Sequence, residues 1–325
     1  MLLEADYGRS IQAAIGVVEG RPHWRVYQNR ILGPYAIEGL SNVFPSYITA
    51  HVFLSIVVLA AAGFIAWRIG ERVGGRRGAL LALVALHLGS ALLLAKQVDV
   101  LPWLYIWDHI DILVFVLFVE FVVAGRPLPW FAALAGVGVF NHESAVFVAG
   151  WLIVDPVARW YLGKTGRIPA AGFDRRRVLA GVLIAATSML VVEWLRTALL
   201  VEEIGPQLFG DPPNTAGGSF HLTLWDNVST LGAIFTQFDY AMPTLVPLYI
   251  LGVVVLVIAI ARRDPDRFLG LAATYLVLIA SLLTFGRLLE TRIYVVLIPV
   301  VVLGAVLLTD PPRPSSINPL PTRDG

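Results

Sequence analysis

The chain has 325 residues, of which 57% are hydrophobic and 14% charged, and its mean hydropathy is +0.75. Soluble domains contain about 45–50% apolar and about 25% charged residues, so the composition excludes a soluble globular fold, a disordered chain and a coiled coil. A net charge of +1 gives no reason to expect nucleic-acid binding, and the lack of cysteine excludes disulfides and thiolate chemistry. The composition therefore predicts an all-α, polytopic transmembrane helical bundle.

Residues 1–46 precede the first long apolar stretch and are predicted to form an outward-facing head. The head contains Glu4 and Asp6 close to its start, and apolar residues at 11, 14, 15 and 18 then follow a helical stripe. This pattern predicts an amphipathic helix that lies on the membrane surface.

Stretches of about 20 mostly apolar residues are long enough to cross a bilayer as helices. Seven candidate spans lie at 47–67, 78–95, 110–125, 178–200, 244–261, 268–285 and 291–309. A further apolar stretch, 128–154, is interrupted by the triplet Asn141-His142-Glu143. It is either one helix with a buried polar triplet or two short helices that meet in a hairpin at the triplet.

Loop charge predicts the orientation of the bundle. The basic segments are 68–77, 155–177 and 262–267, whereas 201–243 has five acidic residues and no Lys or Arg. The positive-inside rule places the basic segments in the cytoplasm and 201–243 outside. A single span over 128–154 would put either Arg126 or the segment 155–177 on the wrong side. We therefore expect two short helices, 128–140 and 144–154, with the triplet toward the outer face.

This topology defines three regions. They are the head 1–46, a transmembrane domain 47–309 with a surface helix at 222–238 in its outer loop 201–243, and a disordered cytoplasmic tail 310–325. We expect a multi-pass protein of the inner (plasma) membrane.

Polar residues gather where several spans meet the predicted outer interface. They are Asp108, His109, Asp111, Asn141, His142, Glu143, Arg287, Glu290 and Arg292. Ionisable groups at membrane depth are costly, so they are expected to face one another or a water-filled cavity. The one-sided distribution predicts a polar cavity that opens outward.

Most of these polar residues also have a purely structural interpretation. Asp108 suits a helix N-cap, Asp111 suits the helix dipole, and Glu290 and Arg292 suit the interface. The remaining structural interpretations are a local ion pair of Glu193 with Arg196 and an interfacial aromatic belt of Trp103, Tyr105, Trp107, Trp130, Trp151 and Trp160. His87 and Glu120, each alone in an apolar span, are interpreted as core hydrogen-bonding or packing residues.

Metal chemistry has weak support in the sequence. Asp108, His109, Asp111, His142 and Glu143 are ligand types that suit a hard divalent cation. Their spacing matches no metal-binding motif, so we expect no metal site and no cofactor, although a divalent cation fits the ligand types.

The order of features resembles the GT-C superfamily of membrane glycosyltransferases, which includes the protein O-mannosyltransferases. In that family an outer loop begins with an acidic residue or pair after the first span, and a surface helix and a polar stretch ending in Pro follow. Glu4, Asp6, the stripe at 11–18, and Arg30 to Pro34 fit this order. Glu4-Ala5-Asp6 stands where the family has an adjacent acidic pair, and no apolar span precedes it within the chain.

The resemblance implies an enzyme that uses a polyprenyl-phosphate sugar donor and an envelope acceptor at the outer face. Asp6, or Glu4 as the alternate, would be the general base on the acceptor hydroxyl. Arg30, Arg287 and Arg292 would hold the lipid phosphate, and His142 and Glu143 would orient hydroxyl groups. The expected partners are therefore the lipid-linked donor and membrane lipids.

A non-enzymatic function is the alternative: a transporter or flippase for lipid-linked glycans, or a partner subunit of an envelope complex. A transporter is expected to contain repeats with broken helices in corresponding halves. The sequence has one broken segment and no visible repeat, which favours the enzyme.

Overall fold

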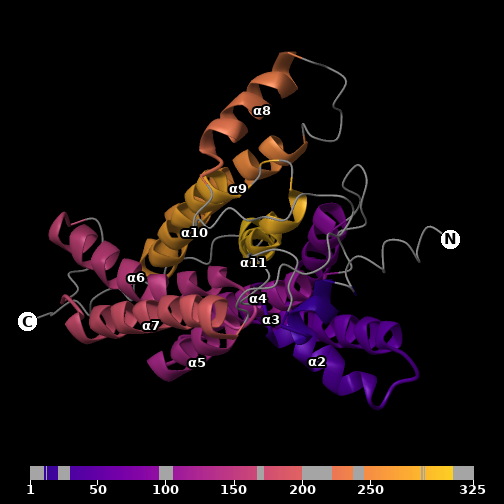
Figure 1. Ribbon diagram of the computed structural model, residues 1–325. Helices are drawn as coiled ribbons and strands as arrows, with labels where there is room; N and C mark the ends of the chain where they lie inside the picture. The colour runs from indigo at the N-terminus through magenta and orange to yellow at the C-terminus, as the bar shows by residue number, and fades with distance from the viewer. Residues whose placement is uncertain are drawn as a thin grey trace, which may run out of the picture.

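The computed structural model describes residues 11, 13–20, 30–94, 105–166, 172–199, 222–236, 245–286, 288 and 290–309. These residues form helices and no strand, which confirms the all-α prediction (Figure 1). The helices are α2 (Leu32–Ser41), α3 (Tyr47–Leu94), α4 (Ile106–Ala124), α5 (Leu128–Gly138), α6 (Val146–Lys164), α7 (Arg175–Trp194), α8 (Leu224–Thr236), α9 (Leu245–Arg263), α10 (Pro265–Phe285) and α11 (Ile298–Thr309). Short 3-10 helices precede α6 (Glu143–Ala145) and α11 (Thr291–Leu297), and a π-helical turn (Leu195–Leu199) continues α7.

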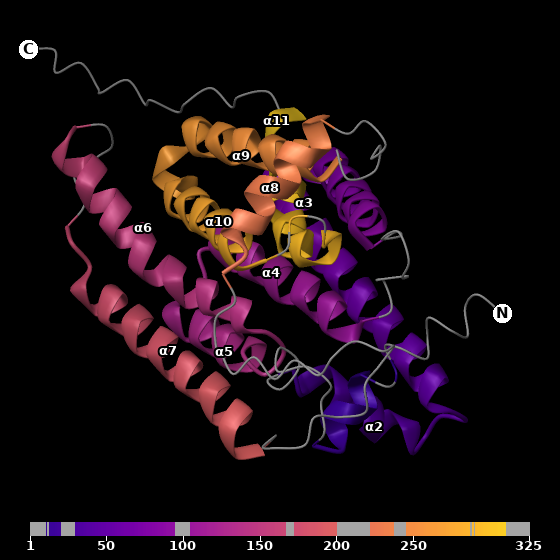
Figure 2. The same cartoon turned by 45° about the horizontal axis from the view of Figure 1, so that its top comes forward.

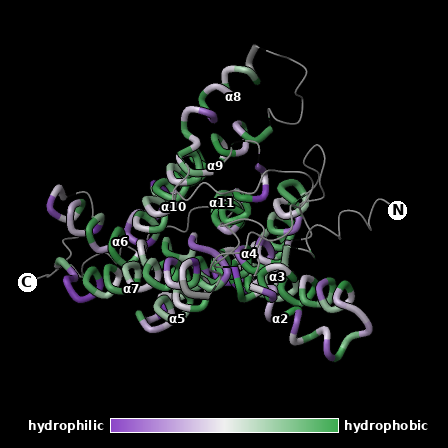
Figure 3. The backbone as a smooth tube through the Cα atoms, in the orientation of Figure 1, coloured by the Kyte–Doolittle hydropathy of each residue, from purple (hydrophilic) through white to green (hydrophobic). Residues whose placement is uncertain are grey.

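The protein is a membrane protein by the length and composition of its helices. Six helical segments of the described chain are long and apolar enough to cross a bilayer. Large apolar side chains point outward along them: Leu80, Val84, Leu88 and Leu92 of α3 are each more than half exposed. Figure 3 shows hydrophobic residues along most of the length of these helices. An outward-facing apolar surface of this extent suits contact with lipid rather than water.

Helix α3 is a hairpin of two antiparallel arms. Its 48 residues would extend about 70 Å as one straight helix, more than twice the thickness of a bilayer core. The helix breaks at Gly74 and Gly75, and Gly75 has φ +62°, a conformation that glycine adopts without strain. The two arms are in contact on either side of the break, because a Cβ atom on Gly70 would collide with the backbone of Gly78. The predicted loop 68–77 is therefore wrong, because Arg68 and Arg72 are helical.

The interrupted stretch 128–154 is broken, as predicted. Helix α5 ends at Gly138, and its carbonyl accepts hydrogen bonds from the N–H groups of Asn141 and His142 at 2.9 Å each. The chain then restarts as the 3-10 turn that leads into α6. Helix α6 continues to Lys164, so the predicted loop at 155–177 is shorter than expected. The second of the two expected short helices is therefore wrong in length, because Glu143–Lys164 is long and apolar enough to cross a bilayer. The depth of the turn in the bilayer stays a prediction.

The predicted surface helix at 222–238 is present as α8. Its Asn227 side chain holds it to the end of α10. The amide Nδ2 donates to the carbonyls of Leu283 at 2.8 Å and Gly286 at 2.7 Å, and Oδ1 accepts from the N–H of Leu288 at 2.7 Å.

The head is described only in part. Residues 13–18 are helical, and of the predicted stripe they bury Ala14, together with Ala13 and Val17, whereas Ile15 and Val18 are only half-buried. Glu4, Asp6 and the tail 310–325 lie outside the described residues.

Helix α4 forms the axis of the bundle. It is buried along nearly its whole length and packs against α2, α3, α5, α10 and α11. Figures 1 and 2 show α4 in the middle of the molecule, with α6 and α7 side by side on one flank. Because Asp108 and Glu120 lie 12 residues apart on α4, about 18 Å of helix separates them. We name the two ends of the bundle the Asp108 end and the Glu120 end.

The predicted basic segments gather at the Glu120 end. Arg68 and Arg72 approach Glu120, and the guanidinium of Arg267 donates to the carbonyl of Val123 near the end of α4. This grouping agrees with the loop-charge argument that placed the basic segments on one side. Which side faces the cytoplasm stays a prediction.

Candidate functional site

The first turns of α4 present two buried carboxylates at the Asp108 end. Asp108 and Asp111 lie three residues apart, so their side chains share one face of the helix. Each is 5% exposed. Helix α4 begins at Ile106 with Tyr105 in the N-cap position, so the N-cap interpretation of Asp108 is wrong. Asp108 instead lies inside the first turn and faces the protein interior.

Arg292 joins Asp108 to Glu290. Its Nη1 atom lies 3.7 Å from Asp108 Oδ2, and its Nη2 atom lies 2.5 Å from Glu290 Oε1. Its guanidinium also stacks over the ring of Tyr105, 4.8 Å from the centroid. The interfacial interpretation of Arg292 is therefore wrong, because its side chain is 11% exposed and points into the bundle.

The triplet between α5 and α6 is tied to α4 through its asparagine. Asn141 is fully buried, and its Nδ2 atom donates to Trp107 O and to Asp111 Oδ1 at 2.8 Å each. Asp111 is thus a hydrogen-bonded anchor for the turn rather than a solvated partner of the helix dipole. The same turn is also held by α2, because the N–H of Leu32 donates to Phe140 O at 2.9 Å.

Arg30 fixes the tautomer of His142. Arg30 Nη2 lies 2.7 Å from His142 Nε2, and a guanidinium has donors only, so Nε2 must accept and the neutral ring carries its proton on Nδ1. That N–H donates to Ser144 Oγ at 2.9 Å and lies 3.9 Å from Asp111 Oδ2. The N–H of Ser144 also points at Nδ1 from 3.1 Å, a contact that would need the other tautomer. Because Arg30 is always protonated and can only donate to Nε2, the tautomer with its proton on Nδ1 is the one that fits.

Glu143 lies close to Arg196, which the sequence spacing pairs with Glu193 instead. Arg196 Nη2 lies 3.5 Å from Glu143 Oε1, although the spacing had suggested a pair with Glu193. Arg196 is 9% exposed and lies in the π-helical turn at the end of α7. A charged residue near the end of an apolar span is a recognisable signal for such a position.

Aromatic rings line the arginines of this site. Trp107 is fully buried and lies under the Arg30 guanidinium, 5.6 Å from its centroid. Tyr105 stacks on Trp107 at 4.9 Å between centroids. The interfacial-belt interpretation is wrong for Trp107, whereas it suits Trp130, which is 51% exposed. Cation–π contacts of this kind stabilise arginine away from water.

The cluster thus brings together most of the predicted site residues. We name it the outer cluster, after the orientation that the loop charges predict. It comprises Arg30, Asp108, Asp111, Asn141, His142, Glu143, Arg196, Glu290 and Arg292. Its members come from five separate segments of the chain. Three arginines face four carboxylates inside an apolar bundle, where unpaired charges would be strongly destabilising.

Four of the predicted site residues are not part of the outer cluster. Glu4, Asp6 and Arg287 lie outside the described residues. His109 is buried but lies toward His51 of α3, away from the outer cluster. Within the described chain no three His, Asp or Glu side chains converge to hold a metal ion. The ligand types noted for a divalent cation are therefore not assembled into a site.

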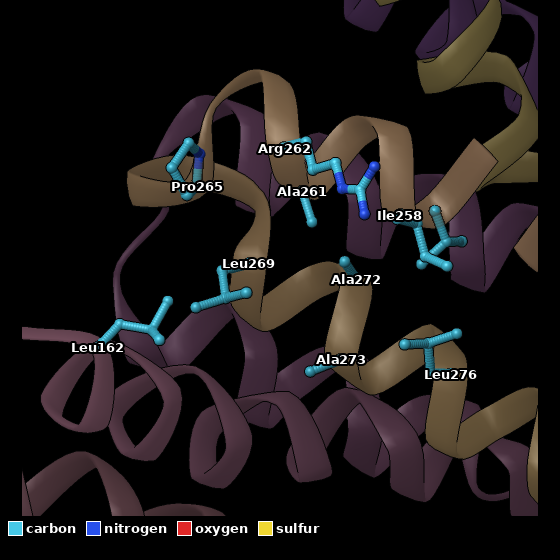
Figure 4. A pocket seen from close by; sticks show the side chains of 10 residues that line it. Leu162, Ile258, Ala261, Arg262, Pro265, Leu269, Ala272, Ala273 and Leu276 are labelled. Carbon is cyan, nitrogen blue, oxygen red and sulfur yellow. The ribbon is translucent and has the colours of Figure 1, made fainter. Parts of the chain in front are cut away.

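An apolar hollow lies elsewhere, between α6, α9 and α10 (Figure 4). Its volume is about 340 Å³, and Arg262 is the one charged residue that lines it. It offers no group of polar side chains for chemistry, so the outer cluster remains the candidate site.

Comparison of the chain with protein-family models, with curated proteins and with solved structures finds no match. The functional argument therefore depends on the site itself.

Proposed function

We propose that the protein is a membrane-embedded glycosyltransferase that resembles the GT-C superfamily. It would transfer a sugar from a polyprenyl-phosphate donor to an envelope acceptor at the outer face of the plasma membrane. The observation that carries the proposal is the outer cluster, in which arginines, carboxylates and a histidine from five segments converge within an apolar bundle. Charged groups inside membrane proteins commonly mark a path or site for a polar substrate.

The arginines of the cluster suit the lipid phosphate. Arg30 contacts His142, and Arg292 contacts Asp108 and Glu290, so both guanidinium groups lie within the outer cluster. Arg–phosphate contacts are short and bidentate, which favours arginine for holding a phosphate leaving group. Both side chains lie on aromatic rings that limit their movement.

The reaction needs one general base. As the acceptor oxygen attacks the anomeric carbon, a carboxylate takes its proton, and the C–O bond to the lipid phosphate breaks with its electron pair left on the phosphate. Asp6, with Glu4 as the alternate, is the proposed base by resemblance. Asp108 is a further candidate among the described carboxylates, because its Oδ2 atom lies beside Arg292, 3.7 Å from Nη1.

A second function has one observation in its favour. Arg196 and Arg292 each face a carboxylate, so the cluster could be a structural network of a non-enzymatic carrier or partner subunit for lipid-linked glycans.

Sugar transfer from a labelled polyprenyl-phosphate donor distinguishes the two functions. The three carboxylate variants are Asp6→Asn, Glu4→Gln and Asp108→Asn. We expect Arg292→Gln, and whichever of these three removes the general base, to transfer sugar about 10²–10⁴-fold more slowly. Arg76→Gln, an exposed residue beside the α3 break, is the matched control and should keep full activity. Transfer that is unchanged in all the carboxylate variants would refute the proposed base, and a wild-type protein that transfers nothing would favour the non-enzymatic function.

A further inference from the structure

A second charged cluster lies at the opposite end of α4. Glu120 is 2% exposed, and three arginines surround it. Arg68 Nη2 lies 3.4 Å and Arg72 Nη2 lies 3.5 Å from Glu120 Oε1, and Arg126 Nε lies 3.8 Å from Oε2. Glu120 is alone in its apolar span in the sequence, but in the fold it faces three arginines from other parts of the chain. We name these four residues the arginine trio and its glutamate.

The trio has more positive charge and more donors than Glu120 can use. Charge-assisted N–H···O bonds are about 2.7–2.9 Å long, and all three distances here are longer. Neither Glu120 Oε1 nor Arg126 Nε makes a hydrogen bond within the described residues. Each arginine side chain is also about one-third exposed, so the trio lies at the surface although Arg126 Nε itself is buried.

The neighbouring buried carboxylate shows what a closed ion-pair network looks like in this fold. Arg159 Nε lies 3.0 Å from both oxygens of Asp155, and Arg177 Nη1 lies 2.8 Å from Oδ2. These contacts are within hydrogen-bonding distance, and Asp155 also packs tightly against Gly270. The Asp155 carboxylate is fully hydrogen-bonded by its two arginines. The Glu120 carboxylate, by contrast, has one negative charge against the three positive charges of its arginines.

The surroundings of the trio suit a lipid headgroup. Arg126 lies over the ring of Trp130, 5.6 Å from its centroid, and Trp130 is half exposed, as is typical of the membrane interface. Phe64 lies one turn before Arg68 on the same arm and is 62% exposed. An apolar surface for an acyl chain therefore adjoins the arginines that would hold its phosphate.

We propose that Arg68, Arg72 and Arg126 bind the phosphate of an anionic membrane lipid, with Glu120 as the internal counter-ion that offsets part of their charge. The site is independent of the proposed sugar transfer, because it lies at the other end of α4 from the outer cluster. Its ligand chemistry is a phosphate with two or more accessible oxygens, which matches the planar donor fork of arginine.

The test measures lipid retained by the purified full chain. The protein in micelles that contain phosphatidylcholine is titrated with phosphatidylglycerol, and bound lipid is counted by native mass spectrometry. The variant Arg68→Gln/Arg72→Gln removes two guanidiniums of the trio. The control Arg76→Gln/Arg77→Gln removes the same charge from exposed residues next to the α3 break. We expect the trio variant to bind at least about 10-fold more weakly and the control to change little.

A second pair of variants keeps the test sharp should the double variant fold poorly. Glu120→Gln removes the competing carboxylate and should raise lipid affinity several-fold, whereas Glu71→Gln, an exposed acid on the same arm, should change it little. Equal losses in the trio variant and its control would overturn the proposal in favour of general surface charge. Inorganic phosphate that displaces the lipid at equal concentration would overturn the lipid assignment in favour of a soluble phosphate ligand.

Discussion

Replacing Asn141 by leucine should destabilise the bundle more than any other single polar substitution in the turn between α5 and α6. Asn141 is fully buried, and its Nδ2 atom serves two acceptors on α4, Trp107 O and Asp111 Oδ1, at 2.8 Å each. Leucine has about the same size, so it leaves the buried Asp111 Oδ1 atom without its donor rather than opening a cavity, while Trp107 O keeps only its bond within α4. The Oδ1 atom of Asn141 has no hydrogen-bond partner in the described residues, so its loss adds no further cost.

The magnitude follows from the charged acceptor that loses its donor. A buried acceptor left unsatisfied costs about 1–3 kcal/mol, and a charged one costs more, so Asn141→Leu should lower the free energy of unfolding by about 2–4 kcal/mol. Unfolding in mixed micelles with rising SDS fraction, followed by circular dichroism, measures this difference. Asn42→Leu is the control, because Asn42 is exposed and its side chain caps α2 locally. A change for Asn141→Leu of less than about 1 kcal/mol would refute the reasoning, because a surface substitution alone costs about 0.5 kcal/mol.

Two further predictions concern the arms of α3 and the orientation of the bundle. Gly70→Leu should destabilise the protein severely in the same unfolding assay, because the new side chain would meet the backbone of the other arm. Gly39→Leu on α2 is the control, because a side chain there has open space and should be tolerated. Equal stability of the two variants would contradict the close contact between the arms. In this cysteine-free chain, Thr165→Cys should resist an impermeant reagent added outside cells and Ser219→Cys should react; the reverse pattern would overturn the predicted orientation.

The helices could be predicted from the sequence because their signals are local. Runs of apolar residues define spans, and the triplet at Asn141 interrupts one of them strongly enough to break the helix. The surface helix α8 was found within two residues at each end. The error at 68–77 has the same local origin, since arginines indicate a loop even where the helix continues to a glycine break.

The partners in the outer cluster could not be predicted in the same way. A span that contacts lipid on one face and protein on the other is apolar on both, so its sequence does not reveal which face is buried. The rotation of α7 about its axis decides whether Arg196 meets Glu193 or Glu143, and packing against α6, with smaller contacts to α5 and the turn between them, sets that rotation. Likewise, Glu120 looks isolated in sequence, and only the fold of α3 brings Arg68 and Arg72 to it.

The most direct test of the proposed function is a density map of the full chain in a lipid bilayer that contains a polyprenyl phosphate. The account predicts phosphate density within hydrogen-bonding distance of Arg30 and Arg292, and its loss in the Arg292→Gln variant. A map in which Arg292 still contacts Asp108 and Glu290, with the lipid phosphate bound elsewhere or not at all, would contradict the assignment of the outer cluster as the donor site.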